Sequence, residues 1–138
     1  KRGDTIVILI FGALLGFISV AFVAYAEHGL REAVSEENFR FLMTAIRYNQ
    51  VNAVVISTIG IALLNGGKLA NIPTLRWSGV LFIAGTVLFS FSIYFSVLLD
   101  IPSFVNLTPV GGIMIMGAWL LLVVAAIWAS KKMGKNVL

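Results

Sequence analysis

The stretch Arg47-Tyr48-Asn49-Gln50-Val51-Asn52 decides the fold, because it places five polar side chains at the start of an apolar run that ends at Leu64. Polar side chains inside a membrane segment cost free energy unless they meet partner groups or a water-lined cavity. The rest of the chain is suited to a membrane: 59% of its 138 residues are hydrophobic and 12% are charged, against about a quarter charged in soluble domains. The other membrane segments therefore have to supply the partners.

Four apolar runs predict an all-α protein, a four-transmembrane-helix bundle that forms one domain over residues 1–138. About 20 residues are needed to cross the ~30 Å of hydrocarbon in a bilayer. The predicted spans are residues 5–26, 46–64, 75–99 and 109–129. Between the first two spans, Ser35 is a predicted N-cap for an amphipathic helix at the membrane interface, which continues into the second span.

The distribution of basic residues predicts the orientation. Four spans put both termini on one side of the membrane. On that side lie Lys1, Arg2, Lys68, Arg76, Lys131, Lys132 and Lys135, and on the other lie Arg31, Arg40 and Arg47. Because basic residues accumulate on the cytoplasmic side, both termini are predicted to be cytoplasmic. We expect a multi-pass protein of the cytoplasmic (inner) membrane.

With this orientation, all four helices bring polar groups to one level near the outer face. The predicted polar cluster consists of Glu27, His28, Arg47, Tyr48, Asn49, Asn52, Ser92, Tyr94 and Thr108. Such a cluster is either a ligand site or a structural network, because intramembrane polar groups serve both purposes.

Two residues of this cluster allow several interpretations. A salt bridge between Arg47 and Glu27 across the first two helices is the simplest role for Arg47, with ligand binding and snorkelling to lipid headgroups as alternatives. The only histidine, His28, is predicted to cap a helix or hold a structural hydrogen bond, with titration as the alternative. A metal site would need further ligands that the sequence does not offer, so we predict none.

Small residues predict where the helices approach closely. The glycines expected at helix contacts are Gly12, Gly16, Gly85, Gly111 and Gly112. A glycine lets two backbones come together because it has no side chain. For the pair Gly12 and Gly16, packing within the chain is favoured over a dimer face.

Four stretches of the chain resemble one known family. They are Ala26-Glu27-His28-Gly29-Leu30, Arg47-Tyr48-Asn49-Gln50-Val51-Asn52-Ala53, Gly85-Thr86-Val87-Leu88-Phe89-Ser90-Phe91-Ser92-Ile93-Tyr94 and Thr108-Pro109-Val110-Gly111-Gly112. In this order they are similar to the domain-of-unknown-function 423 family, small four-helix bacterial inner-membrane proteins that resemble the animal transmembrane protein 256 family. The resemblance implies a fold and a location, but no activity.

Two positions depart from the family pattern. Glu27 stands where the family usually has Ala, and Asn52 stands where it usually has His. A ligand or proton site built on both of the family's histidines would keep only His28 here. The resemblance therefore leaves open whether this chain retains such a site.

The sequence supports two main functional hypotheses. We find no nucleophile elbow, no Gly-rich phosphate loop and no paired intramembrane carboxylates. The first hypothesis is a non-enzymatic accessory or assembly subunit of a membrane complex. The alternative is a small-molecule or lipid binding or transport unit with its site at the outer end of the bundle, and an enzyme comes third. The expected partners are the lipid bilayer and other membrane subunits or further copies of the chain, without nucleic acid or cofactor.

Overall fold

The computed structural model describes residues 2–137 as helices joined by short turns, without strands in that range. Lys1, one of the basic residues used to predict the orientation, and Leu138 lie outside it. The elements in chain order are α1 (Arg2–Tyr25), a π-helical turn (Ala26–Leu30), α2 (Glu36–Leu64), α3 (Gly67–Ala70), α4 (Pro73–Thr86), a second π-helical turn (Val87–Phe91), α5 (Ser92–Leu98), a 3₁₀ helix (Pro102–Leu107) and α6 (Thr108–Val137). The predicted all-α class is confirmed.

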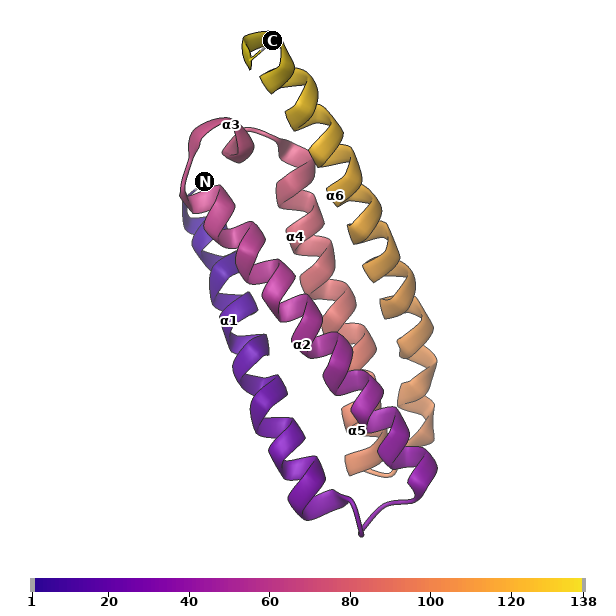
Figure 1. Ribbon diagram of the computed structural model, residues 1–138. Helices are drawn as coiled ribbons and strands as arrows, with labels where there is room; N and C mark the ends of the chain where they lie inside the picture. The colour runs from indigo at the N-terminus through magenta and orange to yellow at the C-terminus, as the bar shows by residue number, and fades with distance from the viewer. Residues whose placement is uncertain (1, 138) are drawn as a thin grey trace.

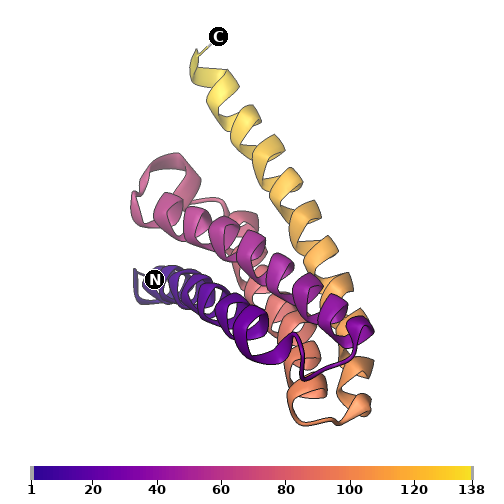
Figure 2. The same cartoon turned by 60° about the horizontal axis from the view of Figure 1, so that its bottom comes forward.

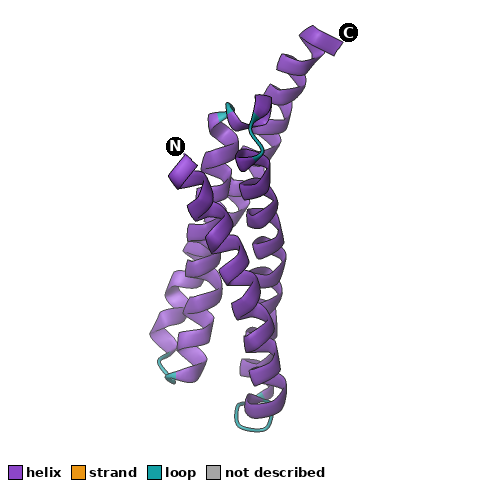
Figure 3. Ribbon diagram, turned by 90° about the vertical axis from the view of Figure 1, so that its left-hand side faces the viewer, coloured by secondary structure: helices purple, strands orange, loops and turns teal. Residues whose placement is uncertain are grey.

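The helices form two packed pairs, α1 with α2 and α4 with α6, and α2 joins the pairs by packing against α4. The described ends of the chain and the turn with α3 lie at one end of the bundle, and the connections 31–35 and 99–107 lie at the other (Figures 1 and 3). The last turns of α6 leave the bundle and point away from α1 and α2 (Figure 2). The two pairs are therefore joined mainly by the contacts of α2 with α4 and α5.

Three helical stretches within the described residues are long and apolar enough to cross a membrane, namely Gly3–Leu30, Pro73–Leu98 and Pro102–Gly134. Helix α2, which contains the predicted second span, is not one of the three. It is nevertheless long enough to cross a membrane, since its 29 residues extend over about 43 Å at ~1.5 Å per residue. Its hydropathy is lowered by the polar stretch from Arg47 to Asn52.

The ends of α2 are formed by local signals. The Ser35 side chain accepts a hydrogen bond from the backbone N–H of Asn38, as expected of an N-cap. At the other end Gly66 and Gly67 take positive φ angles of 78° and 77°, which glycine adopts without steric cost. The predicted amphipathic helix and second span form one unbroken helix between these signals.

The π-helical turn Val87–Phe91 makes one continuous membrane helix of α4 and α5. In a regular α-helix, each interval of four residues turns the side chain about 40° farther around the helix axis than one full turn. A π turn has more residues per turn, so it reduces this rotation. Thr86, Ser90 and Tyr94 follow this spacing and are all at most 3% exposed. Each of them hydrogen-bonds a residue of α2. The turn thus helps to keep one polar face of this helix against α2.

Candidate functional site

The centre of the bundle contains two side-chain hydrogen bonds between α2 and the α4–α5 helix. Asn49 Nδ2 donates to Tyr94 Oη, and Asn52 Nδ2 donates to Thr86 Oγ1, each over 2.9 Å. All four side chains are buried. Because residues three apart lie on one helix face, Asn49 and Asn52 reach the same neighbour. The NH₂ group of each amide thus has a partner on the neighbouring helix, as burial in an apolar bundle favours.

Hydroxyl groups add further bonds between helices at the same level. Ser90 Oγ donates to the backbone oxygen of Ala45 over 2.8 Å. The hydroxyls of Ser92 and Thr108 lie 2.6 Å apart and share a hydrogen bond, which connects α5 to the start of α6. The polar residues therefore join α2, α4, α5 and α6.

This network leaves one acceptor open. The buried polar side-chain atoms without a partner, within the part of the chain that the structure describes, are Asn49 Oδ1, Thr74 Oγ1 and Arg76 Nε. Only Asn49 Oδ1 belongs to the network. The side-chain donors of Asn49, Asn52 and Ser90 are thus used between helices.

The outer members of the predicted cluster do not join this network. His28, Arg47 and Tyr48 are exposed. Glu27 pairs with Arg31 at 2.6 Å, so the predicted ion pair between Glu27 and Arg47 is wrong. Arg31 lies four residues after Glu27 and reaches it without crossing to another helix. Among the described residues, no group of three or more His, Asp or Glu side chains is placed to hold a metal ion.

Glycines allow the close contact between α1 and α2. A Cβ on Gly12 would lie 2.5 Å from Ser57 Oγ, and one on Gly60 would lie 2.9 Å from the backbone of Leu9. Both distances are too short for a real side chain. At Gly16 the nearest atom would be 3.8 Å away, an ordinary contact. The structure therefore places the tight contact at Gly12 and Gly60, whereas Gly16, which was also predicted, has room for a methyl group.

The contact between α4 and α6 has the same character. A Cβ on Gly111 would lie 2.7 Å from the carbonyl oxygen of Gly85, and one on Gly85 would lie 3.0 Å from that of Gly111. The neighbouring Gly112 is different, because its nearest contact would be 3.7 Å away. Farther along the same pair of helices, Ser78 Oγ donates to the backbone oxygen of Ala118 over 2.8 Å. Close approach of these two helices thus requires glycine at two of the three predicted positions.

The predicted cluster omitted some residues that matter in the structure. Thr86 and Ser90 hydrogen-bond to α2, and their four-residue spacing with Tyr94 is visible in the sequence. The spacing of Glu27 and Arg31 likewise signals an ion pair. Gly60 stands in α2 without another glycine four residues away, so the small-residue pattern does not reveal it.

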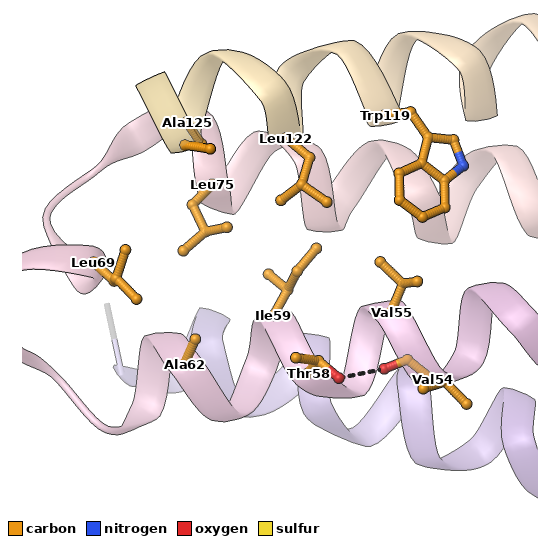
Figure 4. A pocket seen from close by; sticks show the side chains of 11 residues that line it. Val54, Val55, Thr58, Ile59, Ala62, Leu69, Leu75, Trp119, Leu122 and Ala125 are labelled. Atoms are coloured by element: carbon orange, nitrogen blue, oxygen red, sulfur yellow. Dashed lines mark hydrogen bonds between the residues drawn. The ribbon is translucent and has the colours of Figure 1, made fainter. Parts of the chain in front are cut away.

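An apolar groove of about 420 Å³ lies between α2 and α6, with Leu69 of α3 near one end (Figure 4). The hydroxyl group of Thr58, which lines the groove, donates to the backbone oxygen of Val54 over 2.8 Å and is therefore not free to donate to a ligand. The side chains around it include Val55, Ile59, Leu75, Trp119 and Leu122. This lining suits a hydrocarbon chain or an apolar helix face rather than a polar ligand.

Comparisons with known proteins give a consistent result. The family model described as "Protein of unknown function (DUF423)" matches residues 22–112. The UPF0382 inner membrane protein YgdD of Escherichia coli (strain K12) is 32% identical over 124 residues, which cover 90% of this chain and 92% of that protein. A UPF0382 membrane protein of Staphylococcus epidermidis is 31% identical over 121 residues, covering 88% of this chain and 95% of the relative. No solved structure matches the chain.

The matched region contains all four stretches on which the resemblance rests. The relatives align with most of the chain and with most of their own length, so the similarity is not confined to one helix. The resemblance is confirmed, and the chain belongs to the DUF423 family, with UPF0382 membrane proteins among its relatives.

Proposed function

We propose that the protein crosses the inner membrane four times, with α2 as the second crossing and with both termini in the cytoplasm. The length of α2 supports this topology. So do the hydrogen bonds that the Nδ2 groups of Asn49 and Asn52 donate to the neighbouring helix, because a bonded donor costs less in a membrane than an open one. The first turns of α2, from Glu36 to Ile46, would then lie at the outer interface as an amphipathic segment.

We infer that the protein is a non-enzymatic accessory or assembly subunit of a membrane complex. The observation that carries this proposal is that three pairs of polar side chains, Asn49–Tyr94, Asn52–Thr86 and Ser92–Thr108, bond each other between helices, so they act as structural ties. Long apolar faces remain on the outside, with Phe17 on α1 71% exposed and Leu120 on α6 67% exposed. Such faces are available to lipid or to the helices of a partner.

Purification from the native membrane in mild detergent tests this proposal. We expect the tagged protein to retain a partner in fixed stoichiometry. Enlarging an exposed face while keeping it apolar should displace a helix that packs there. We therefore expect either Leu120→Trp or Phe17→Trp to lose the partner while the other variant keeps it, each serving as the control for the other. A protein that runs alone or only as a homo-oligomer would contradict the subunit proposal.

A second candidate function is a small-molecule or lipid binding unit with its site at the outer end of the bundle. A cavity of about 360 Å³ favours it, because polar groups of Asn38, Ser96, Asp100 and Thr108 line the cavity beside apolar side chains. Binding sites typically combine an apolar wall with a few polar groups. In the same purification, a lone homo-oligomer that retains a bound molecule would support this candidate over the first.

A further inference from the structure

A cleft of about 550 Å³ lies between α1 and α4, at the end of the bundle that contains the N-terminus. It forms because α1 packs mainly on α2, and α4 mainly on α6. Asp4 and Arg76 line it together with Trp77. Its other walls are apolar and include Val7, Phe11, Val80 and Ala84.

Arg76 carries a donor that the protein leaves unused. Its Nε–H is buried and has no hydrogen-bond partner in the part of the chain that the structure describes. Asp4 lines the same cleft, yet the ion pair found among the described residues joins Glu27 and Arg31, so Asp4 and Arg76 are not paired. A buried guanidinium donor without a partner is costly and calls for an acceptor.

The order of groups along the cleft follows that of a phospholipid. Asp4 and Arg76 each lie near the first turn of their helices. From Asp4 to Phe11 the cleft continues for about 10 Å along α1, and from Arg76 to Ala84 for about 12 Å along α4, at ~1.5 Å per residue. Trp77, 62% exposed beside Arg76, has the position of an interfacial anchor. In the proposed topology, the charged groups therefore lie at the membrane surface and the apolar walls lie deeper.

We propose that this cleft binds one phospholipid with a primary amine in its headgroup, of the phosphatidylethanolamine type. Arg76 donates to the phosphate and Asp4 accepts from the ammonium group, while an acyl chain lies along Val7, Phe11, Val80 and Ala84. The opposite charges of Asp4 and Arg76 match the opposite charges of this headgroup. An anionic lipid without an amine would leave the Asp4 carboxylate beside a negative headgroup, so it fits less well.

Delipidated full-length protein in detergent provides the test. Phosphatidylethanolamine, phosphatidylcholine and phosphatidylglycerol with identical acyl chains are added separately, and bound lipid is counted by native mass spectrometry. A charge-assisted hydrogen bond lost from a site changes affinity about tenfold or more. We expect the wild type to bind phosphatidylethanolamine about tenfold more tightly than the other two lipids.

Variants separate the two charged groups. Asp4→Asn should lower the affinity for phosphatidylethanolamine to that for phosphatidylcholine. The quaternary ammonium of phosphatidylcholine has no hydrogen to donate, so it gains nothing from the Asp4 carboxylate as a hydrogen-bond acceptor. Arg76→Gln should weaken the binding of all three lipids. If Arg76→Gln does not accumulate, Arg76→Lys, which keeps the charge, replaces it in the same binding measurement. Lys132→Gln changes an exposed basic residue of α6 outside the cleft and should have no effect.

Equal binding of the three lipids by the wild type would overturn the proposal, as would an unchanged lipid preference in Asp4→Asn. Asp4 and Arg76 could also simply pair with each other in solution. In that event their substitutions would change the stability of the lipid-free protein in a non-additive way and leave lipid binding unaltered, which again overturns the proposal. The subunit proposal does not depend on this cleft, so failure here leaves it intact.

Discussion

Gly111→Ala should lower the free energy of unfolding by about 1–3 kcal/mol, the usual cost of overpacking a close contact, whereas Gly112→Ala should leave it unchanged or raise it. The new methyl group at position 111 would lie 2.7 Å from the carbonyl oxygen of Gly85, which belongs to a backbone and cannot turn aside. At position 112 the nearest atom is 3.7 Å away, and alanine favours a helix over glycine by up to about 1 kcal/mol.

The two variants differ by one position and carry the same chemical change, so each controls for the other. Thermal unfolding in a single detergent, together with the amount of protein in the membrane, measures the effect. Equal stability of Gly111→Ala and Gly112→Ala would show that α4 and α6 do not approach each other at Gly85 and Gly111.

Asn52→Leu and Thr86→Val should each lower the free energy of unfolding by about 1–2 kcal/mol, while the double variant should cost clearly less than the sum. Each single change leaves one polar group of the Asn52–Thr86 hydrogen bond buried without its partner. The double change removes both polar groups and keeps the number and branching of the side-chain heavy atoms. Non-additivity of this kind identifies residues that interact directly.

Thr58→Val provides a matched control for this cycle. Thr58 bonds the backbone oxygen of Val54 within its own helix, so its change should add to that of Asn52→Leu without coupling. Denaturant or thermal unfolding of the four proteins gives the coupling energy. Simple additivity of Asn52→Leu and Thr86→Val would mean that the two helices are not joined at this bond.

The fold class followed from patterns that act locally. Hydrophobic runs predicted the helices, and Ser35 predicted the start of α2, where its side chain indeed accepts a hydrogen bond from Asn38. The expected continuation of the amphipathic helix into the second apolar run is also found, because α2 continues through Arg47 without interruption. The residues around Arg47 contain no glycine or proline that would end a helix there.

The candidate site was predictable in part, because amides at membrane depth require partners. Asn49, Asn52 and Tyr94 were expected near one another, and hydrogen bonds bring Asn49 to Tyr94. The pairing of Asn52 with Thr86 was not predictable. It depends on which face the α4–α5 helix turns toward α2, and this face is set by the π-helical turn Val87–Phe91, which the sequence pattern does not show. Glu27 was assigned to Arg47 because both lie at one depth, but the closer Arg31 occupies it.

The most direct test of the account asks whether α2 crosses the membrane. The native chain has no cysteine, so in a single-cysteine variant any thiol labelling comes from the introduced residue. Ala33 and Asn71 suit this test because they flank α2 in exposed turns. An impermeant thiol reagent should label Ala33→Cys in intact cells and should label Asn71→Cys only after the membrane is opened. Labelling of both positions from the same side would contradict the four-span bundle.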